Sequence, residues 1–100
     1  MTLASIAAEA FTPYVNRPFT LRAADGSVEV ELAEVRVMPP RYNAPEATRK
    51  AFSLIFLGPE GMPLPEGAYE LTPPGEDPMA SYFVPLGWQD RRLRLQVIFS

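Results

Sequence analysis

The sequence contains neither cysteine nor histidine among its 100 residues. Without cysteine the chain has no disulfide and no thiolate nucleophile, and without histidine it lacks the commonest general acid or base. Zinc sites of the usual kind also depend on these two residue types. The composition therefore predicts a protein that is not an enzyme, with no metal site and no cofactor.

Long apolar runs and an excess of positive charge are missing as well. No stretch approaches the roughly 20 apolar residues that a membrane-spanning helix needs, and the net charge is −3. Proteins that bind nucleic acids or membrane surfaces usually carry a basic face. Residues 1–12 have no positive segment ahead of their apolar stretch, so we expect no signal peptide. We therefore expect no nucleic-acid or membrane partner, and a location in the cytoplasm or in an assembled particle.

The residues that are present suit one small folded domain, 1–100. One hundred residues is the size of a single domain, and the hydrophobic fraction of 47% is enough for a core. A core of this size leaves little room for a deep substrate cavity, because the same few side chains must pack the interior.

Most of the chain alternates between apolar and polar residues, which is typical of half-buried strands. Six segments have this pattern or a short apolar run: 19–23, 28–37, 51–57, 67–72, 81–86 and 93–99. Asp25-Gly26 predicts a hairpin between the first two. The short links favour an all-β antiparallel meander, which we expect to close into a small barrel or a tight sandwich.

The second of these segments changes phase partway along. Val35 and Val37 have the opposite parity to Val30 and Leu32. A β-bulge near Ala33-Glu34 would return both pairs to one face. Two short strands separated by a bend are the alternative.

The third and last segments carry large apolar residues at every second position and therefore predict the core. The third segment has few polar residues on either face, which is typical of a central strand. In the predicted core, Phe52, Leu54 and Phe56 face Leu93, Leu95 and Val97.

Pro85 lies in the fifth segment and lacks a backbone N–H, so it predicts an edge position or an early end for that strand.

A short helix is predicted over Leu3–Ala10, where Leu3, Ile6 and Ala10 form an apolar stripe. So short a helix is not stable alone in water, so it must dock on another surface. We expect it to cover one end of its own barrel. Docking on a neighbouring subunit is the alternative.

One charged pattern and one glycine-rich pattern are candidate sites. Glu29 and Glu31 share one face of a strand, as the paired carboxylates of a hydrolase do, but the solvated side of a half-buried strand explains them better. Arg92 and Arg94 would pair with them if the strands were neighbours. The segment Gly58–Gly67 lacks the Lys-Ser/Thr ending of a phosphate-binding loop. It predicts a rigid hairpin connection, with a proline-rich ligand segment as the alternative.

Three residues are candidates for contact with a partner protein. Trp88 lies in a predicted turn, where an exposed indole is a typical interface anchor and a ring folded over the barrel mouth is the alternative. Tyr42 and Arg41 lie in the polar loop Pro39–Lys50, and loops of this length are often functional. These residues predict a non-enzymatic structural or interaction module with a protein partner or self-association. The alternative is a small-molecule or carbohydrate-binding domain that uses Trp88 and Tyr42 at a barrel mouth.

The order of motifs resembles that of a family of small bacterial β domains of unknown function. The resemblance extends from Phe11 to Phe99, and its most specific parts are Phe52-Ser-Leu54, Leu64-Pro-x-Gly-x-Tyr69 and Phe83-Val-Pro85. It implies a compact β domain associated with phage-tail-collar-like proteins. The expected role is then an accessory or structural part of a tail-like particle or a surface assembly, and the resemblance implies no catalytic residue.

Overall fold

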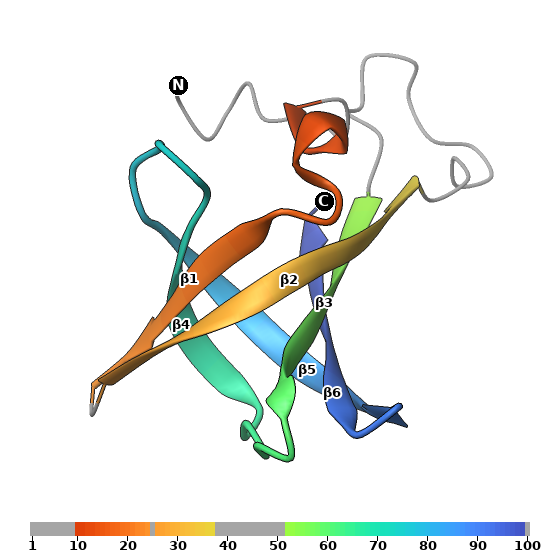
Figure 1. Cartoon of the computed structure of the whole chain (residues 1–100). Coiled ribbons are helices and arrows are strands. Elements are labelled where there is room, and N and C mark those ends of the chain that lie inside the picture. Colours follow the sequence, from red (N-terminus) through yellow and green to blue (C-terminus); the bar gives the residue numbers. More distant parts are fainter. Residues whose placement is uncertain (1–9, 25, 38–51, 100) are drawn as a thin grey trace, which may run out of the picture.

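The computed structural model describes residues 10–24, 26–37 and 52–99. They form six strands and one turn of 3-10 helix (Figure 1). The elements are η3 (Thr12–Tyr14), β1 (Pro18–Ala23), β2 (Gly26–Val37), β3 (Phe52–Glu60), β4 (Gly67–Thr72), β5 (Met79–Gln89) and β6 (Arg92–Phe99).

The strands close into one antiparallel barrel in the order β1-β2-β3-β6-β5-β4. The predicted all-β barrel of six strands is confirmed, and the sandwich is not what forms. The simple meander is wrong, because β3 pairs with β6 and β4 pairs with β1. The chain forms two three-stranded meanders, β1–β3 and β4–β6, which join edge to edge and enclose one interior (Figure 1). Because β3 pairs with β6 and β1 pairs with β4, the outer strands of both meanders have partners. This removes most of the free sheet edge.

The predicted bulge in β2 is confirmed. The register of β2 against β3 shifts between Leu32 and Glu34. Val30 and Leu32 are buried, and after the bulge Val35 packs against the core. Val37 does not reach the interior and is exposed near the end of the strand.

Side chains from all six strands fill the barrel interior. All six residues of the predicted core are buried, and Leu54 lies opposite Val97 on the neighbouring strand. The Phe56 ring spans the interior, with its centroid 5.0 Å from that of Phe19 and 5.8 Å from that of Phe83. Even eight-stranded barrels are just wide enough for side chains to fill, so six strands leave a narrower, packed interior.

Strand β3 is buried on both faces, as predicted for a central strand. It lies between β2 and β6. Phe52, Leu54 and Phe56 point inward, while Ser53 and Ile55 have the opposite parity and are also buried. The continuous apolar run of the sequence reflects this two-sided burial.

One end of the barrel is covered by residues that precede β1. The Phe11 ring is buried against Phe52 and Phe99, with centroids 5.9 and 5.7 Å away, and Tyr14 packs edge-on against Phe19. The helix predicted over Leu3–Ala10 lies outside the described residues except for its last residue. The 3-10 turn η3 lies beside this end of the barrel (Figure 1).

Strand β5 confirms one prediction and corrects another. It pairs with β4 as far as Phe83 and with β6 from Val84 onward. Pro85 therefore has a strand on one side only, as predicted, but the strand does not end early, because a proline with a single neighbour need not donate to the ladder. The chain turns at Asp90-Arg91, whose φ angles are 50° and 70°. Trp88 is therefore a strand residue, and its predicted place in the turn is wrong.

Candidate functional site

Trp88 is the one predicted contact residue that the structure describes. Its side chain is 54% exposed, and neither a ring contact nor a hydrogen bond joins it to another described residue. The register of β5 against β6 places Trp88 opposite the core residue Leu93, and Trp88 stays exposed there rather than becoming part of the buried core. Tyr42 and Arg41 lie outside the described residues, and the structure does not test them.

The stretch of β5 that carries Trp88 has an unusual edge. From Val84 to Gln89 it pairs with β6, and no described strand pairs with its other side. Pro85 removes a donor there, and the register shift between Pro85 and Gly87 makes Leu86 a bulge residue that is 40% exposed. Prolines and bulges prevent a strand edge from pairing with another chain. This stretch therefore presents two apolar side chains to a partner, those of Leu86 and Trp88.

The β3–β4 connection contributes one side chain to the core. Leu64 packs against the core, and its Cδ1 lies 3.4 Å from the place that a Cβ on Gly58 would occupy. The missing side chain of Gly58 therefore makes room for Leu64.

Two tyrosine hydroxyls hold this connection in place. Tyr69 donates to the carbonyl oxygen of Pro65 at 2.6 Å, and Tyr82 donates to the Glu66 carboxylate at 2.8 Å. The hydrogen bond to Glu66 raises the pKa of Tyr82 above its ordinary value. The connection is held in place, as its prolines predict. It is not the predicted hairpin, because β3 and β4 do not pair.

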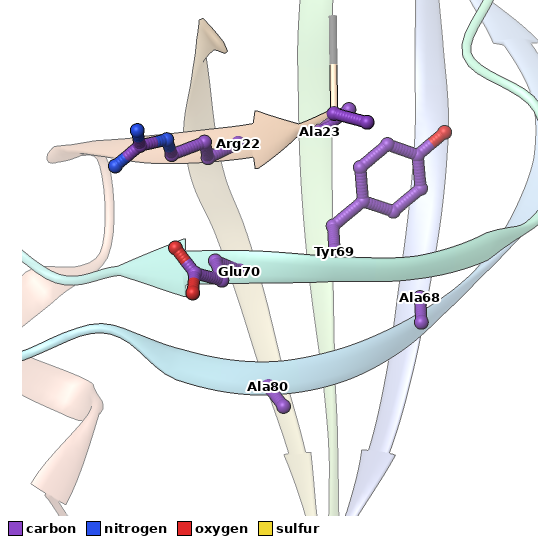
Figure 2. A pocket seen from close by; sticks show the side chains of 7 residues that line it. Arg22, Ala23, Ala68, Tyr69, Glu70 and Ala80 are labelled. Atoms are coloured by element: carbon purple, nitrogen blue, oxygen red, sulfur yellow. The ribbon is translucent and has the colours of Figure 1, made fainter. Parts of the chain in front are cut away.

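A cleft opens where the barrel closes on itself. Strands β1 and β4 pair at only three positions, the last of which is Arg22 opposite Glu70. Beyond that pair lies a cleft of about 570 Å³, lined by Arg22, Ala23, Ala24, Ala68, Tyr69, Glu70 and Ala80. Figure 2 shows Tyr69 extending toward Ala23 and the two charged side chains on adjacent strands. Sequence reasoning missed this cleft because it depends on a pairing between strands that are far apart in the chain.

The predicted interaction between the glutamates of β2 and the arginines of β6 is partly confirmed. Arg92 forms an ion pair with Glu31 at 2.9 Å, although their strands are separated by β3 and are not neighbours. The same guanidinium donates to the carbonyl oxygens of Gly58 and Leu57 at 2.8 and 3.1 Å. Glu29 is exposed, and no three acidic residues in the described ranges are placed to hold a metal ion.

A second ion pair lies on the outer face of β2. Glu34 accepts a hydrogen bond from Arg36 at 2.7 Å. This bond lowers the pKa of Glu34 and raises the pKa of Arg36. Both side chains are about half exposed, so the pair is solvated and is expected to contribute little to stability.

These features define a small closed β-barrel domain with a packed interior. A family model described as "Domain of unknown function (DUF6916)" matches residues 6–99, and the chain belongs to this family. The resemblance to a family of small domains of unknown function is thus confirmed. Neither curated proteins nor solved structures gave a match to the chain. No helix among the described residues is long and apolar enough to cross a membrane.

Proposed function

We propose that this domain is a non-enzymatic structural module that associates with protein, and that it does so through Leu86 and Trp88. The observation that carries the proposal is the exposure of both side chains on the one-sided stretch of β5. Tryptophan is enriched among the residues that contribute most to protein interfaces. A large apolar side chain that is about half exposed in its own domain gains free energy when a partner covers the exposed part.

The packed interior supports a function at the surface. Phe19, Phe56 and Phe83 meet across the centre of the barrel, so the space that larger barrels offer to a ligand is occupied by side chains. Arg92, the first residue of β6, already binds Glu31 and two carbonyl oxygens, so its guanidinium is not available to a ligand.

The specific form of the proposal is an accessory part of a tail-like particle or surface assembly. The motif order from Phe11 to Phe99 supports it, through the resemblance to bacterial β domains associated with phage-tail-collar-like proteins. Such a part would be made in the cytoplasm and then packed beside copies of itself. The proposal therefore predicts that the isolated chain self-associates.

Sedimentation velocity over a wide range of protein concentrations tests it. We expect the full chain to form oligomers as the concentration rises, and the double variant Leu86→Ser, Trp88→Ser to remain monomeric. The matched control is Ile98→Ser, because Ile98 is equally exposed but lies on the outer wall of β6. A chain that is monomeric at every concentration, or oligomers that persist in the double variant, would contradict the proposal.

A further inference from the structure

We infer that the cleft between β1 and β4 binds a neutral saccharide, with Arg22 and Glu70 as its polar contacts. The cleft exists because the two strands separate after their third paired position. Ala23, Ala24 and Ala68 line the opening, and their small side chains leave its space unfilled (Figure 2). A volume of about 570 Å³ lies in the range of small-molecule sites.

Two opposite charges lie side by side at the cleft without pairing. Arg22 and Glu70 are directly opposed in the register of β1 and β4, and both are exposed. Opposed residues on antiparallel strands have Cβ atoms only about 5 Å apart, within easy reach for side chains of this length. In the described structure no ion pair or hydrogen bond engages either side chain. Both groups are therefore available to a ligand.

The pair Arg22 and Glu70 selects the charge of its ligand. The guanidinium only donates hydrogen bonds and the ionised carboxylate only accepts them. A simple anion drawn to Arg22 is repelled by Glu70, and a simple cation drawn to Glu70 is repelled by Arg22. A neutral molecule with neighbouring hydroxyl groups satisfies both residues, because each hydroxyl both accepts and donates.

Hydroxyl-bearing residues extend this surface on the other side of the charged pair. A second open cleft, of about 520 Å³, shares Arg22 and Glu70 with the first and adds Thr20, Ser27 and Thr72. These hydroxyls are further donors and acceptors for a polyhydroxylated ligand. The surface around the charged pair is therefore open and rich in polar groups, which suits a polyhydroxylated ligand.

An aromatic ring lies next to the cleft. Tyr82 lies opposite Ala68 on the neighbouring strand, and its side chain is 55% exposed. Its hydroxyl is held by Glu66, which limits the movement of the ring. The face of an aromatic ring packs on apolar C–H groups, and a sugar ring presents such groups on one of its faces. The small side chains of Ala68 and Ala80 leave room for the sugar ring to approach Tyr82.

The test is an NMR titration of the full ¹⁵N-labelled chain with glucose, galactose, mannose and N-acetylglucosamine in turn. We expect saturable shifts for at least one sugar, confined to Arg22–Ala24, Ala68–Glu70 and Ala80–Tyr82. Arg22→Ala and the isosteric Glu70→Gln should each weaken binding about tenfold or more, because each removes a hydrogen bond to a charged group. Arg17→Ala and Glu60→Gln are the matched controls, since both residues are exposed and lie outside the cleft.

Four outcomes would overturn the inference. They are the absence of saturable shifts with every sugar, equal binding by Glu70→Gln, shifts centred on Trp88, and stronger binding of inorganic phosphate or free arginine at the same residues. The melting temperature of each variant shows whether it is folded. Because Glu70→Gln keeps the shape of the side chain, the test does not depend on the larger change at Arg22.

Discussion

The guanidinium of Arg92 lies 2.9 Å from the carboxylate of Glu31, although the strands that carry them are separated by β3. Arg92 reaches across the end of β3 and donates to the carbonyl oxygens of Leu57 and Gly58 on its way. It spans the point where the register of β3 against β6 shifts, between Leu57 and Glu60. One side chain thus ties together β2, β3 and β6.

Replacing Arg92 should therefore destabilise the barrel more than replacing an arginine in a simple surface pair. We expect Arg92→Ala to lower the free energy of unfolding by about 1–3 kcal/mol, because it leaves two carbonyl oxygens and Glu31 without their donor. The control Arg36→Ala removes only a solvated partner of Glu34 and should change it by less than about 0.5 kcal/mol. Urea unfolding measures both values. Equal losses in the two variants would show that the three-strand contact contributes nothing.

Leu54 tests the assignment of the core. It is fully buried in the middle of β3, opposite Val97. Leu54→Ala should cost about 2–5 kcal/mol of unfolding free energy, because it removes buried surface and leaves a cavity. A loss below about 1 kcal/mol in urea unfolding would mean that the inner face of β3 is misassigned.

Ser81 is a polar residue on the inner side of the barrel wall. Its Oγ atom is buried and has no hydrogen-bond partner among the described residues. Burying an unpaired hydroxyl is unfavourable, so Ser81→Ala should raise the free energy of unfolding by up to about 1 kcal/mol. The exposed Ser27→Ala is the control and should have little effect. Destabilisation by Ser81→Ala would show that the hydroxyl has a partner after all.

The hydrogen bond between Tyr82 and Glu66 predicts that the pKa of Tyr82 falls when Glu66 is replaced. The hydrogen bond to Glu66 raises the pKa of Tyr82, so the folded chain holds the phenol proton more tightly than the unfolded chain does. The contribution of this pair to stability is therefore full below the ordinary tyrosine pKa and is lost as the pH rises through the raised value. In Glu66→Gln, NMR titration of the ring should show a lower pKa for Tyr82. An unchanged pKa in that variant would refute the hydrogen bond as its cause.

The sequence predicted the strands, the bulge in β2 and the core well because these features have local signals. Alternation marks the inner residues of β3 and β6, and the change of phase between Leu32 and Val35 marks the bulge. The order of the strands has no such signal. Whether β3 pairs with β4 or with β6 depends on contacts between strands that are far apart in the chain, and no short pattern encodes that.

The candidate sites were harder to predict for the same reason. The glycine before Trp88 is typical of a turn, whereas the true turn uses two residues other than glycine at positive φ, Asp90 and Arg91. Arg22 and Glu70 look like ordinary outward residues of two separate strands, and only the β1–β4 pairing brings them to one cleft. Leu86 became exposed through a bulge next to Pro85 that the sequence did not reveal.

The fluorescence of Trp88 tests the central claim most directly, because it is the only tryptophan in the chain. In dilute solution its exposed indole should emit at the long wavelengths of a solvated ring and should be readily quenched by acrylamide. If this domain associates through Leu86 and Trp88, raising the protein concentration should shift the emission to shorter wavelengths and reduce quenching, and Leu86→Ser should weaken both changes. Emission and quenching that stay the same while the chain forms oligomers would contradict the account, because Trp88 would then lie outside the interface.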